Sequence, residues 1–476
     1  PRESEKIFYK MMAKLEFLPN SPTLFNAGTK LGQLAACFVL PVEDSLKSIF
    51  TAVKNMAIIE QSGGGVGFDF SKLRPKGDIV KSTKGVASGP ISFMRVFDVA
   101  TDVIKAGGKR RGAMMGVLRV DHPDIEEFIT AKQKPGVLSN FNISVAITDD
   151  FMEKLEKDEE YWLINPRNKM KVKKLKARYI WNLIAESAWK SGDPGVIFID
   201  EINRHNPTLE VGRIEATNPC GEQPLLPYES CNLGSINLSR MVEDGKINWK
   251  KLRETVRNAV HFLDNVIDAN KFPLREIERM TKANRKIGLG VMGFADMLIK
   301  LGIPYNSEKA LSLAERIMKF ITEEARKKSV ELGEERGSFP NFDKSVWKDK
   351  YSAMRNATVT TIAPTGSISI IAGCSSGIEP LFAISFIRNV LGGKRLFEIN
   401  PLFELIAKER GFYSAKLFEE IAKTGSIQKI DGIPEDVKKV FVTALDISPE
   451  WHVKMQAAFQ KFTDNAVSKT VNLPHE

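Results

Sequence analysis

The sequence has few of the residues that build disulfide-linked or metal-stabilised folds. Its 476 residues include only four cysteines and five histidines, and no two cysteines form a Cys-x-x-Cys motif. Small secreted domains held by disulfides are much richer in cysteine. Structural zinc sites need four closely spaced Cys or His ligands. We therefore expect no disulfide scaffold, no metal site and a cytoplasmic protein.

Long apolar runs are also absent. No run reaches the roughly 18 residues of a membrane span, so we expect no membrane association. Hydrophobic residues make up 43% and charged residues 27% of the chain, as in ordinary globular proteins. There is no internal repeat and no low-complexity linker. The simplest prediction is a single large domain over residues 1–476.

The charge balance is moderately basic. Lys and Arg number 69 against 59 Asp and Glu, which gives a net charge of +10. This favours an anionic ligand such as a nucleotide. The densest basic run, residues 169–178, alternates Lys with apolar residues and predicts a solvated strand or helix face. The aromatic-interleaved basic stripe typical of single-strand binders is absent, so no nucleic-acid partner is expected.

Apolar periodicity predicts an α/β fold. Helices are predicted over residues 7–15, 93–104, 248–268 and 308–333, and the second of these is expected to stop at Gly107 and Gly108. Strands are predicted over residues 113–120, 141–147, 196–199 and 358–362.

Five loops are rich in Gly, Pro, Asn and Ser. They are residues 19–28, 62–67, 218–222, 230–235 and 363–369. Such loops can hold ligands through main-chain N–H groups, although any one of them alone is more typical of a turn.

The loop Asn-Pro-Cys-Gly-Glu at 218–222 is the most unusual. Asn218, Cys220 and Glu222 alternate, so all three side chains can project to one side of an extended segment. A neighbouring carboxylate raises the pKa of a thiol, and the loop contains no His to act as its base. This pattern favours radical chemistry at sulfur over ordinary nucleophilic attack. Cys231 follows closely enough for a hairpin to bring it near Cys220.

The other two cysteines have different expectations. Cys37 lies far from Cys220 in sequence, so only the fold could unite them. A lone cysteine such as Cys374 is usually a small buried apolar side chain.

The segment 288–293 matches Gly-x-Gly-x-x-Gly, the pattern of dinucleotide-binding loops. Residues 282–286, which precede it, do not form a buried strand pattern, and no acidic residue follows at the required distance. We therefore predict that it is not a dinucleotide site.

Together and in this order, the loops resemble those of the ribonucleotide reductase catalytic subunit, most closely the adenosylcobalamin-dependent class II. The resemblance rests on residues 109–116, 218–222, 230–237, 363–369 and 464–470 and runs from about residue 19 to the end. It implies a ten-stranded α/β barrel of two five-stranded parallel halves, with a central finger loop that carries Cys220.

The resemblance also implies roles for the site residues. Cys220 would carry a thiyl radical, Glu222 would be the acid/base on the ribose 3′ hydroxyl, and Asn218 would hold that hydroxyl. Cys37 and Cys231 would supply two electrons and end as a disulfide. The implied substrate-binding residues are Ser21, Ala36, Cys37, Gly64, Gly65, Asn218, Pro219, Cys220, Gly221, Glu222, Thr365, Gly366, Ser367 and Ile368, of which the last four would cradle phosphate.

Regulation and partners follow from the same resemblance. The effector site would comprise Asp44, Ser45, Leu46, Arg74 and Lys81, in an N-terminal helical part of about residues 1–110 that also carries the dimer contact. We expect a ribonucleoside diphosphate substrate, deoxynucleoside triphosphate or ATP effectors, adenosylcobalamin, a thioredoxin-like dithiol and a homodimer. No C-terminal redox tail and no N-terminal regulatory domain are expected.

Three alternatives remain open. The chain could be the large subunit of a class I reductase, which takes its radical from a metal-containing partner subunit. It could be a non-catalytic nucleotide sensor, although sensing needs none of the three cysteines. The glycyl-radical class is disfavoured, because it does not use the Cys37 position as a dithiol partner.

Overall fold

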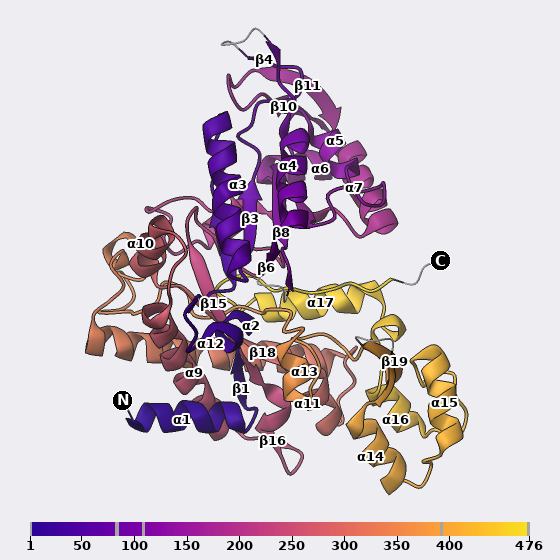
Figure 1. Cartoon of the computed structure of the whole chain (residues 1–476). Helices are drawn as coiled ribbons and strands as arrows, with labels where there is room; N and C mark the ends of the chain where they lie inside the picture. Colours follow the sequence, from indigo (N-terminus) through magenta and orange to yellow (C-terminus); the bar gives the residue numbers. More distant parts are fainter. Residues whose placement is uncertain (1, 81–84, 107–109, 391–393, 474–476) are drawn as a thin grey trace.

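A mixed sheet of eight strands organises the molecule. The computed structural model describes residues 2–80, 85–106, 110–390 and 394–473 (Figure 1). In spatial order the strands are β1 (Phe17–Pro19), β15 (Ser230–Asn237), β2 (Cys37–Leu40), β3 (Gly65–Asp69), β8 (Met114–Arg119), β9 (Phe141–Ile147) and β12 (Gly195–Phe198), with β18 (Ile287–Met292) on the other edge of β15.

The strand directions divide the sheet into two halves. β2, β3, β8, β9 and β12 run parallel and form the predicted five-stranded half-barrel. β15 pairs antiparallel with β2, and β18 continues parallel to β15, so the second half runs in the opposite direction. The predicted strands 113–120, 141–147 and 196–199 are β8, β9 and β12. The α/β barrel fold is confirmed.

The second half is less regular than expected. Residues 358–362 do not form the predicted strand; instead, Thr360 bridges Leu289 and Ile362 bridges Val467. Backbone hydrogen bonds still hold the segment on both sides: the Thr361 N–H donates to the Leu289 carbonyl at 3.1 Å, and the Ser468 N–H donates to the Ile362 carbonyl at 2.9 Å. The Asn465 side-chain amide adds a bond to the Thr360 carbonyl at 2.9 Å. Eight regular strands and these bridges therefore stand where ten strands were predicted.

Helices cover the outer face of the first half (Figure 1). They are α3 (Leu46–Gln61), α4 (Pro90–Val103), α5 (Ile125–Thr130), α6 (Asp149–Glu156) and α7 (Ala177–Ser191). In α3, Ile49, Ala52, Met56 and Ile59 recur every three or four residues and are buried, as expected of an amphipathic helix. The predicted helix 93–104 is α4; Gly107 and Gly108 lie outside the described residues.

A second set of helices covers the other half. They are α1 (Arg2–Ala13), α9 (Trp249–Ala269), α10 (Arg275–Asn284), α11 (Phe294–Lys300), α12 (Glu308–Arg336) and α17 (Pro449–Gln460). α9 and α12 confirm the predicted helices 248–268 and 308–333. The helix predicted over 7–15 ends earlier, at Ala13, because Leu15 adopts a left-handed conformation with φ of 55°.

The C-terminal third carries a small subdomain with its own core. α14 (Pro401–Glu409), α15 (Ala415–Thr424) and α16 (Glu435–Val440) lie beside the hairpin β19 (Ser385–Val390) and β20 (Lys394–Ile399), at the lower right of Figure 1. Phe403 stacks edge-on against Phe418 and Phe441 at its centre. Among the described helices, none combines the length and the apolar character that a bilayer crossing requires.

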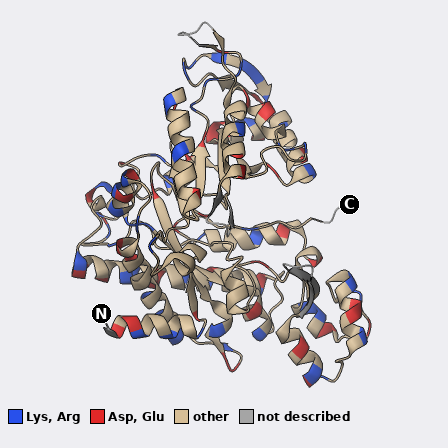
Figure 2. Ribbon diagram, in the orientation of Figure 1, with Lys and Arg blue, Asp and Glu red and all other residues tan. Residues whose placement is uncertain are grey.

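Shorter elements complete the chain. They are α2 (Ser21–Asn26), α8 (Ile199–Arg204), α13 (Ile368–Ala372), β4 (Ile79–Val80), β5 (Gly85–Val86), β6 (Lys105–Ala106), β7 (Arg110–Arg111), β10 (Glu160–Ile164), β11 (Lys171–Lys176), β13 (Ala216–Thr217), β14 (Pro224–Leu225), β16 (Val242–Glu243) and β17 (Lys246–Ile247). Figure 2 shows Lys and Arg scattered over the molecule. The basic run 169–178 includes β11, a largely exposed strand, as predicted.

Candidate active site

A finger-like hairpin carries the motif at 218–222 into the barrel. β13 and β14 pair antiparallel, and residues 218–223 form the tip between them. The Asn218 amide N–H donates to the Gln223 carbonyl at 3.1 Å, and the Gly221 N–H donates to the Asn218 carbonyl at 3.1 Å. Gly221 has φ of 82°, a conformation that favours glycine. The predicted finger loop is therefore present, and local turn chemistry shapes it.

Glycines in the surrounding strands make room for the finger. A Cβ atom on Gly67 would lie 1.7 Å from the Thr217 carbonyl oxygen, and one on Gly65 would lie 2.8 Å from Pro219 Cγ. A Cβ on Gly288 would lie 2.6 Å from Gln223 Nε2. The Gly-x-Gly-x-x-Gly segment overlaps strand β18, and a Cβ on its second glycine, Gly290, would lie 2.3 Å from the Thr361 carbonyl oxygen. These two glycines therefore serve close packing and not a dinucleotide loop.

Two cysteines from different halves of the barrel face each other. Cys37 on β2 and Cys231 on β15 are direct partners in the antiparallel pairing. Such partners have Cα atoms about 4.5–5.5 Å apart, within the roughly 4.4–6.8 Å that a disulfide spans. Both thiols are free and buried. Burial raises the pKa of both thiols well above the usual value, and the charge of Glu222 raises that of Cys37 further.

The finger presents its amide and carboxyl groups to Cys37. Asn218 Nδ2 donates to Cys37 Sγ at 3.2 Å, and Glu222 Oε1 lies 3.9 Å from the same sulfur. Burial raises the pKa of Glu222 to about 7. Its Oε2 atom is buried and has no hydrogen-bond partner among the described residues. A carboxyl with such a pKa can take up and release a proton near neutral pH.

A cavity of about 250 Å³ lies against these groups. All the predicted substrate residues except Gly221 line it: Ser21, Ala36, Cys37, Gly64, Gly65, Asn218, Pro219, Cys220, Glu222, Thr365, Gly366, Ser367 and Ile368. Thr365 has φ of 57°, and its hydroxyl accepts from the Gly377 N–H at 2.7 Å, which fixes the loop that leads into α13. The fold thus unites these five separate sequence segments around one cavity.

A second and larger hollow reaches the finger from another side. It is a groove of about 1680 Å³, and Pro219, Cys220 and Gly221 are among its lining residues. Pro219 and Cys220 line both spaces, and Cys220 is exposed. Cys220 therefore stands at the junction of a small cavity and a wide groove.

Sequence reasoning missed one titratable residue of the small cavity. Glu60, near the end of α3, lines the cavity and is fully buried. The Thr101 hydroxyl lies 3.0 and 3.2 Å from its two carboxylate oxygens. Burial raises the pKa of Glu60 to about 7. The available signal was an acidic residue on the apolar face of an amphipathic helix, one turn before the glycine loop.

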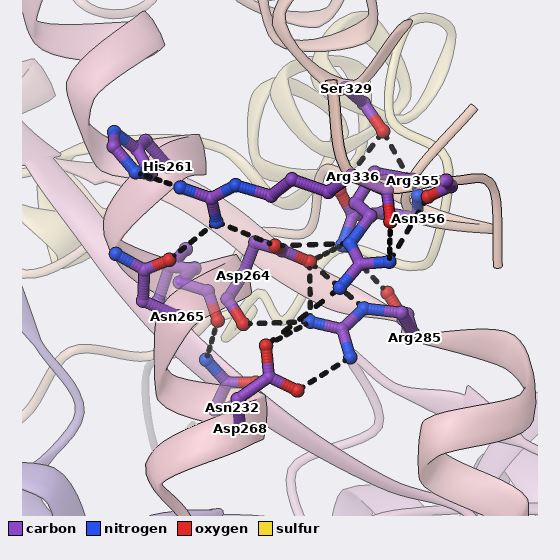
Figure 3. A network of polar contacts seen from close by, with 12 residues as sticks. Asn232, His261, Asp264, Asn265, Asp268, Arg285, Ser329, Arg336, Arg355 and Asn356 are labelled. Atoms are coloured by element: carbon purple, nitrogen blue, oxygen red, sulfur yellow. Dashed lines mark hydrogen bonds and ion pairs between the residues drawn. The ribbon is translucent and has the colours of Figure 1, made fainter. Parts of the chain in front are cut away.

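A buried polar network supports the strand that carries Cys231. Asn232, the next residue, donates to the Leu263 carbonyl at 3.0 Å. Figure 3 shows the neighbouring Asp264, which is fully buried and accepts from Arg285 at 2.8 Å and from Asn356 at 3.0 Å. Arg355 contacts the same carboxylate at 3.3 Å. Because these groups come from four chain segments, they tie β15, the residues before β18 and residues 355–356 to α9.

The predicted effector residues lie together at the start of α3. Arg74 holds Asp44 through Nε at 2.9 Å and through a guanidinium nitrogen at 2.9 Å. Ser45 caps α3, because its hydroxyl accepts from the Ser48 N–H at 3.2 Å. Leu46 is exposed. Lys81 lies outside the described residues. Among the described residues, no group of three or more His, Cys, Asp or Glu side chains could hold a metal ion.

Comparisons with known proteins agree with this geometry. Residues 35–476 match the family described as "Ribonucleotide reductase, barrel domain", and residues 1–32 match "Ribonucleotide reductase, all-alpha domain". A solved structure, the class Id ribonucleotide reductase alpha subunit of Actinobacillus ureae, superposes with a TM-score of 0.80 at 26% identity, over 97% of this chain and 82% of that one.

Two curated relatives bear the name vitamin B12-dependent ribonucleoside-diphosphate reductase. The Thermoplasma acidophilum protein is 62% identical over 98% of this chain, and a Mycobacterium tuberculosis protein is 52% identical over 98%. The chain spans 61% of the length of the first relative and 67% of the second. Because the barrel-domain match covers residues 35–476 and the relatives match nearly the whole chain, the chain belongs to the ribonucleotide reductase family.

Proposed function

We propose that the chain is the catalytic part of an adenosylcobalamin-dependent ribonucleoside-diphosphate reductase. One observation carries the proposal: the finger brings Asn218 and Glu222 against Cys37, which lies directly opposite Cys231. Replacing a ribose C–OH by C–H requires two electrons, and a facing dithiol supplies them as it closes to a disulfide. The names of the two relatives support the diphosphate substrate and the cofactor.

The residues divide the reaction between them. A thiyl radical on Cys220 takes the hydrogen atom from the ribose 3′ carbon, and Glu222 accepts the proton of the 3′ hydroxyl. The 2′ hydroxyl leaves as water with a proton from the dithiol. Cys37 and Cys231 give up two electrons and two protons in total and form one disulfide; one proton leaves in the water and the other ends on the 2′ carbon. Glu222 then returns its proton to the 3′ oxygen, and Cys220 returns its hydrogen to the 3′ carbon. The products are a deoxynucleotide, water and a disulfide.

Strand order supports an orientation for the substrate. Cys37 on β2 pairs with Gly65 on β3, and the Ala113 carbonyl accepts from the Val66 N–H on the far side of β3. Gly65 and Ala113 therefore lie on one side of the cysteines. The loop at 365–368 follows the segment bridged to β18, on the other side. With the phosphates at that loop and the ribose at the cysteines, the base lies toward Gly64 and Gly65.

The groove that reaches Cys220 fits a large cofactor. Its volume of about 1680 Å³ exceeds the roughly 300–1,000 Å³ of a typical small-molecule pocket. Apolar side chains such as Trp189 and Phe198 and amides such as Gln456 and Asn465 line it, which suits a broad ring system with amide substituents. These residues would hold adenosylcobalamin, which when bound supplies the unpaired electron that closed-shell side chains lack. Pro219 and Gly221 would fix the position of Cys220 at the floor.

The class I large subunit is the alternative that a specific observation favours. The Actinobacillus ureae protein, named as a class Id alpha subunit, shares the fold over nearly the whole chain. The identity of 26% is far below the 62% shared with the B12-dependent relative. A nucleotide sensor is disfavoured, because sensing needs neither a dithiol nor a buried carboxyl beside it.

Effector binding and dimer formation complete the proposal. A deoxynucleoside triphosphate or ATP binds at Asp44 and Arg74 and selects the base that is reduced. Two copies meet through the neighbouring helices α3 and α4, where Leu46, Phe50, Val99 and Val103 are exposed apolar side chains. A thioredoxin-like dithiol renews the cysteines, and the protein works in the cytoplasm as a single catalytic domain.

The decisive experiment uses the chain alone. Under anaerobic conditions, with adenosylcobalamin, cytidine diphosphate and dithiothreitol, we expect deoxycytidine diphosphate to form. Omission of the cobalamin should remove the product. Product that forms only after addition of a metal-containing second protein would assign the chain to class I instead.

A further inference from the structure

An ion pair joins two hairpins at the edge of the first half-barrel. Arg167 follows β10, and Asp78 precedes β4; Figure 1 shows β4, β10 and β11 side by side at the top of the molecule. Arg167 Nε donates to Asp78 Oδ2 at 3.0 Å, and a guanidinium nitrogen donates to Oδ1 at 2.8 Å. This bidentate arrangement is the strong form of an arginine–carboxylate contact.

The Asp78 carboxylate is held on both oxygens. The Asn165 amide donates to Oδ2 at 3.1 Å, and the Ile79 N–H donates to Oδ1 at 2.8 Å. The Asn165 side-chain oxygen in turn accepts from the Arg167 N–H at 3.0 Å, which fixes the backbone that carries the guanidinium. The hydrogen bond from Arg167 holds the pKa of Asp78 well below its usual range. The carboxylate is only 12% exposed and the guanidinium 27%.

The same contacts continue into the proposed effector residues. Arg74 donates to the Ile79 carbonyl at 3.4 Å, directly after Asp78, and also pairs with Asp44 at 2.9 Å. Asp44 precedes Ser45, the residue that caps α3. A continuous chain of polar contacts therefore runs from the β10–β11 hairpin, through Asp78 and Arg74, to the start of α3.

We propose that Arg167 is a positioning residue of the effector site: through Asp78 it fixes the segment from Arg74 to Ile79 in the position that a nucleoside triphosphate needs. The inference rests on the proposed effector binding at Asp44 and Arg74. A guanidinium that is already oriented loses less conformational entropy when it meets phosphate, so preorganisation raises affinity without a contact from Arg167 to the ligand. The carboxylate is shielded from solvent and the contact is bidentate, so the pair holds the two hairpins in one relative geometry.

The test compares triphosphate binding in matched variants. Deoxythymidine triphosphate is titrated calorimetrically into the parent chain, Arg167→Ala and Lys173→Ala. Lys173 lies on the same hairpin and pairs with Glu126, but these side chains are 57% and 34% exposed and lie outside the contact chain. We expect Arg167→Ala to weaken binding by roughly 2- to 30-fold, the range for residues that act through a network. Lys173→Ala should bind like the parent.

Charge reversal separates positioning from a general loss of structure. Arg167→Asp and Asp78→Arg should each weaken binding, and the double variant should regain most of the affinity, with melting temperatures measured for all three. A double variant that folds and binds as weakly as the single variants contradicts the inference. If Arg167→Ala does not fold, Arg167→Lys and Asp78→Asn, which conserve size, take its place.

The two levels of the proposal fail in different ways. A parent chain that does not bind the triphosphate overturns the proposed effector site, and the inference falls with it. A parent that binds, with Arg167→Ala binding equally well, overturns the inference alone.

Discussion

Cys37 and Cys231 lie opposite each other on antiparallel strands at the junction of the two half-barrels. The two strands belong to halves that run in opposite directions, so the pair exists only because the halves meet there. This relationship gives the first prediction. Incubation with one equivalent of substrate, cofactor and no reductant should oxidise these two thiols to one disulfide.

Alkylation followed by mass mapping measures that outcome. Cys374, which lies outside the cavity, should remain free and serves as the internal control. Two free thiols at Cys37 and Cys231 after formation of one equivalent of deoxynucleotide would exclude them as the electron donors.

Cys220→Ser should abolish reduction and leave substrate binding nearly intact. A hydroxyl O–H bond is much harder to break homolytically than a thiol S–H bond, so serine cannot carry the radical. Deoxynucleotide yield and substrate affinity are measured in parallel, with Cys374→Ser as the matched control. Turnover above a few per cent of the parent value would remove Cys220 from its proposed role.

Glu222 should impose a pH dependence on the reaction. Burial raises its pKa to about 7, so the carboxylate, our proposed acceptor of the 3′ hydroxyl proton, gains population as the pH rises through 7. We expect kcat/KM to rise between about pH 6 and pH 8. Glu222→Gln should lower kcat by roughly 10²- to 10⁴-fold and remove this rise. The assignment is wrong if the Gln variant keeps both the rate and the pH profile.

Glu60 should make the folded state less stable as the pH rises. Its pKa is raised from 4.5 to about 7, so the folded protein holds this proton more tightly than the unfolded chain. The stabilisation is complete below pH 4.5 and is lost as the pH rises through 7. The shift corresponds to a free energy on the order of 3 kcal/mol.

Glu60→Gln removes this titration. The free energy of unfolding of the parent should fall from pH 5 to pH 8 relative to that of the variant, as measured by urea denaturation at each pH. The exposed Glu254→Gln on α9 is the control and should follow the parent. An identical pH dependence in the parent and in Glu60→Gln would contradict the raised pKa.

Gly67→Ala should disturb the finger directly. The added methyl group would lie 1.7 Å from the Thr217 carbonyl oxygen, and because this atom belongs to the backbone, relief requires the finger to move. We expect a loss of about 1–3 kcal/mol of stability and a larger loss of turnover. Gly212→Ala, whose Cβ would lie 3.6 Å from Leu226, is the matched control and should be tolerated.

The sequence predicted the parts of the fold that depend on local pattern. α9, α12, β8 and β9 follow from apolar periodicity, and the finger follows from turn residues that act over a few positions. Residues 358–362 pair with β18 and with Val467 only through isolated bridges, and these distant partners leave no trace in the local apolar pattern. The need for glycine at Gly67 depends on Thr217, about 150 residues away, so no local pattern could explain it.

The site residues also fall into those that a local pattern predicted and those that depend on the tertiary fold. Cys220, Asn218 and Glu222 lie within one short motif, so their shared face could be inferred from alternation alone. The pairing of Cys37 with Cys231 came from resemblance, because only the tertiary fold unites the two strands. Glu60 was missed although it stands on the buried face of its helix, because most of the cavity that it lines is built from distant segments.

The burial of Cys37 and Cys231 determines the order in which the nucleotide and an external reductant can bind. Cys37 lines the cavity of about 250 Å³ that the nucleotide would fill, and Cys231 is fully buried behind it. On the proposed function, an external reductant reaches Cys37 through the space that the nucleotide has just left. Reduction of the substrate and re-reduction of the disulfide then become alternating half-reactions in the same cavity. Such an enzyme shows double-displacement kinetics, with parallel double-reciprocal plots. An excess of the nucleotide slows the reaction with the reductant, and an excess of the reductant slows the reaction with the nucleotide.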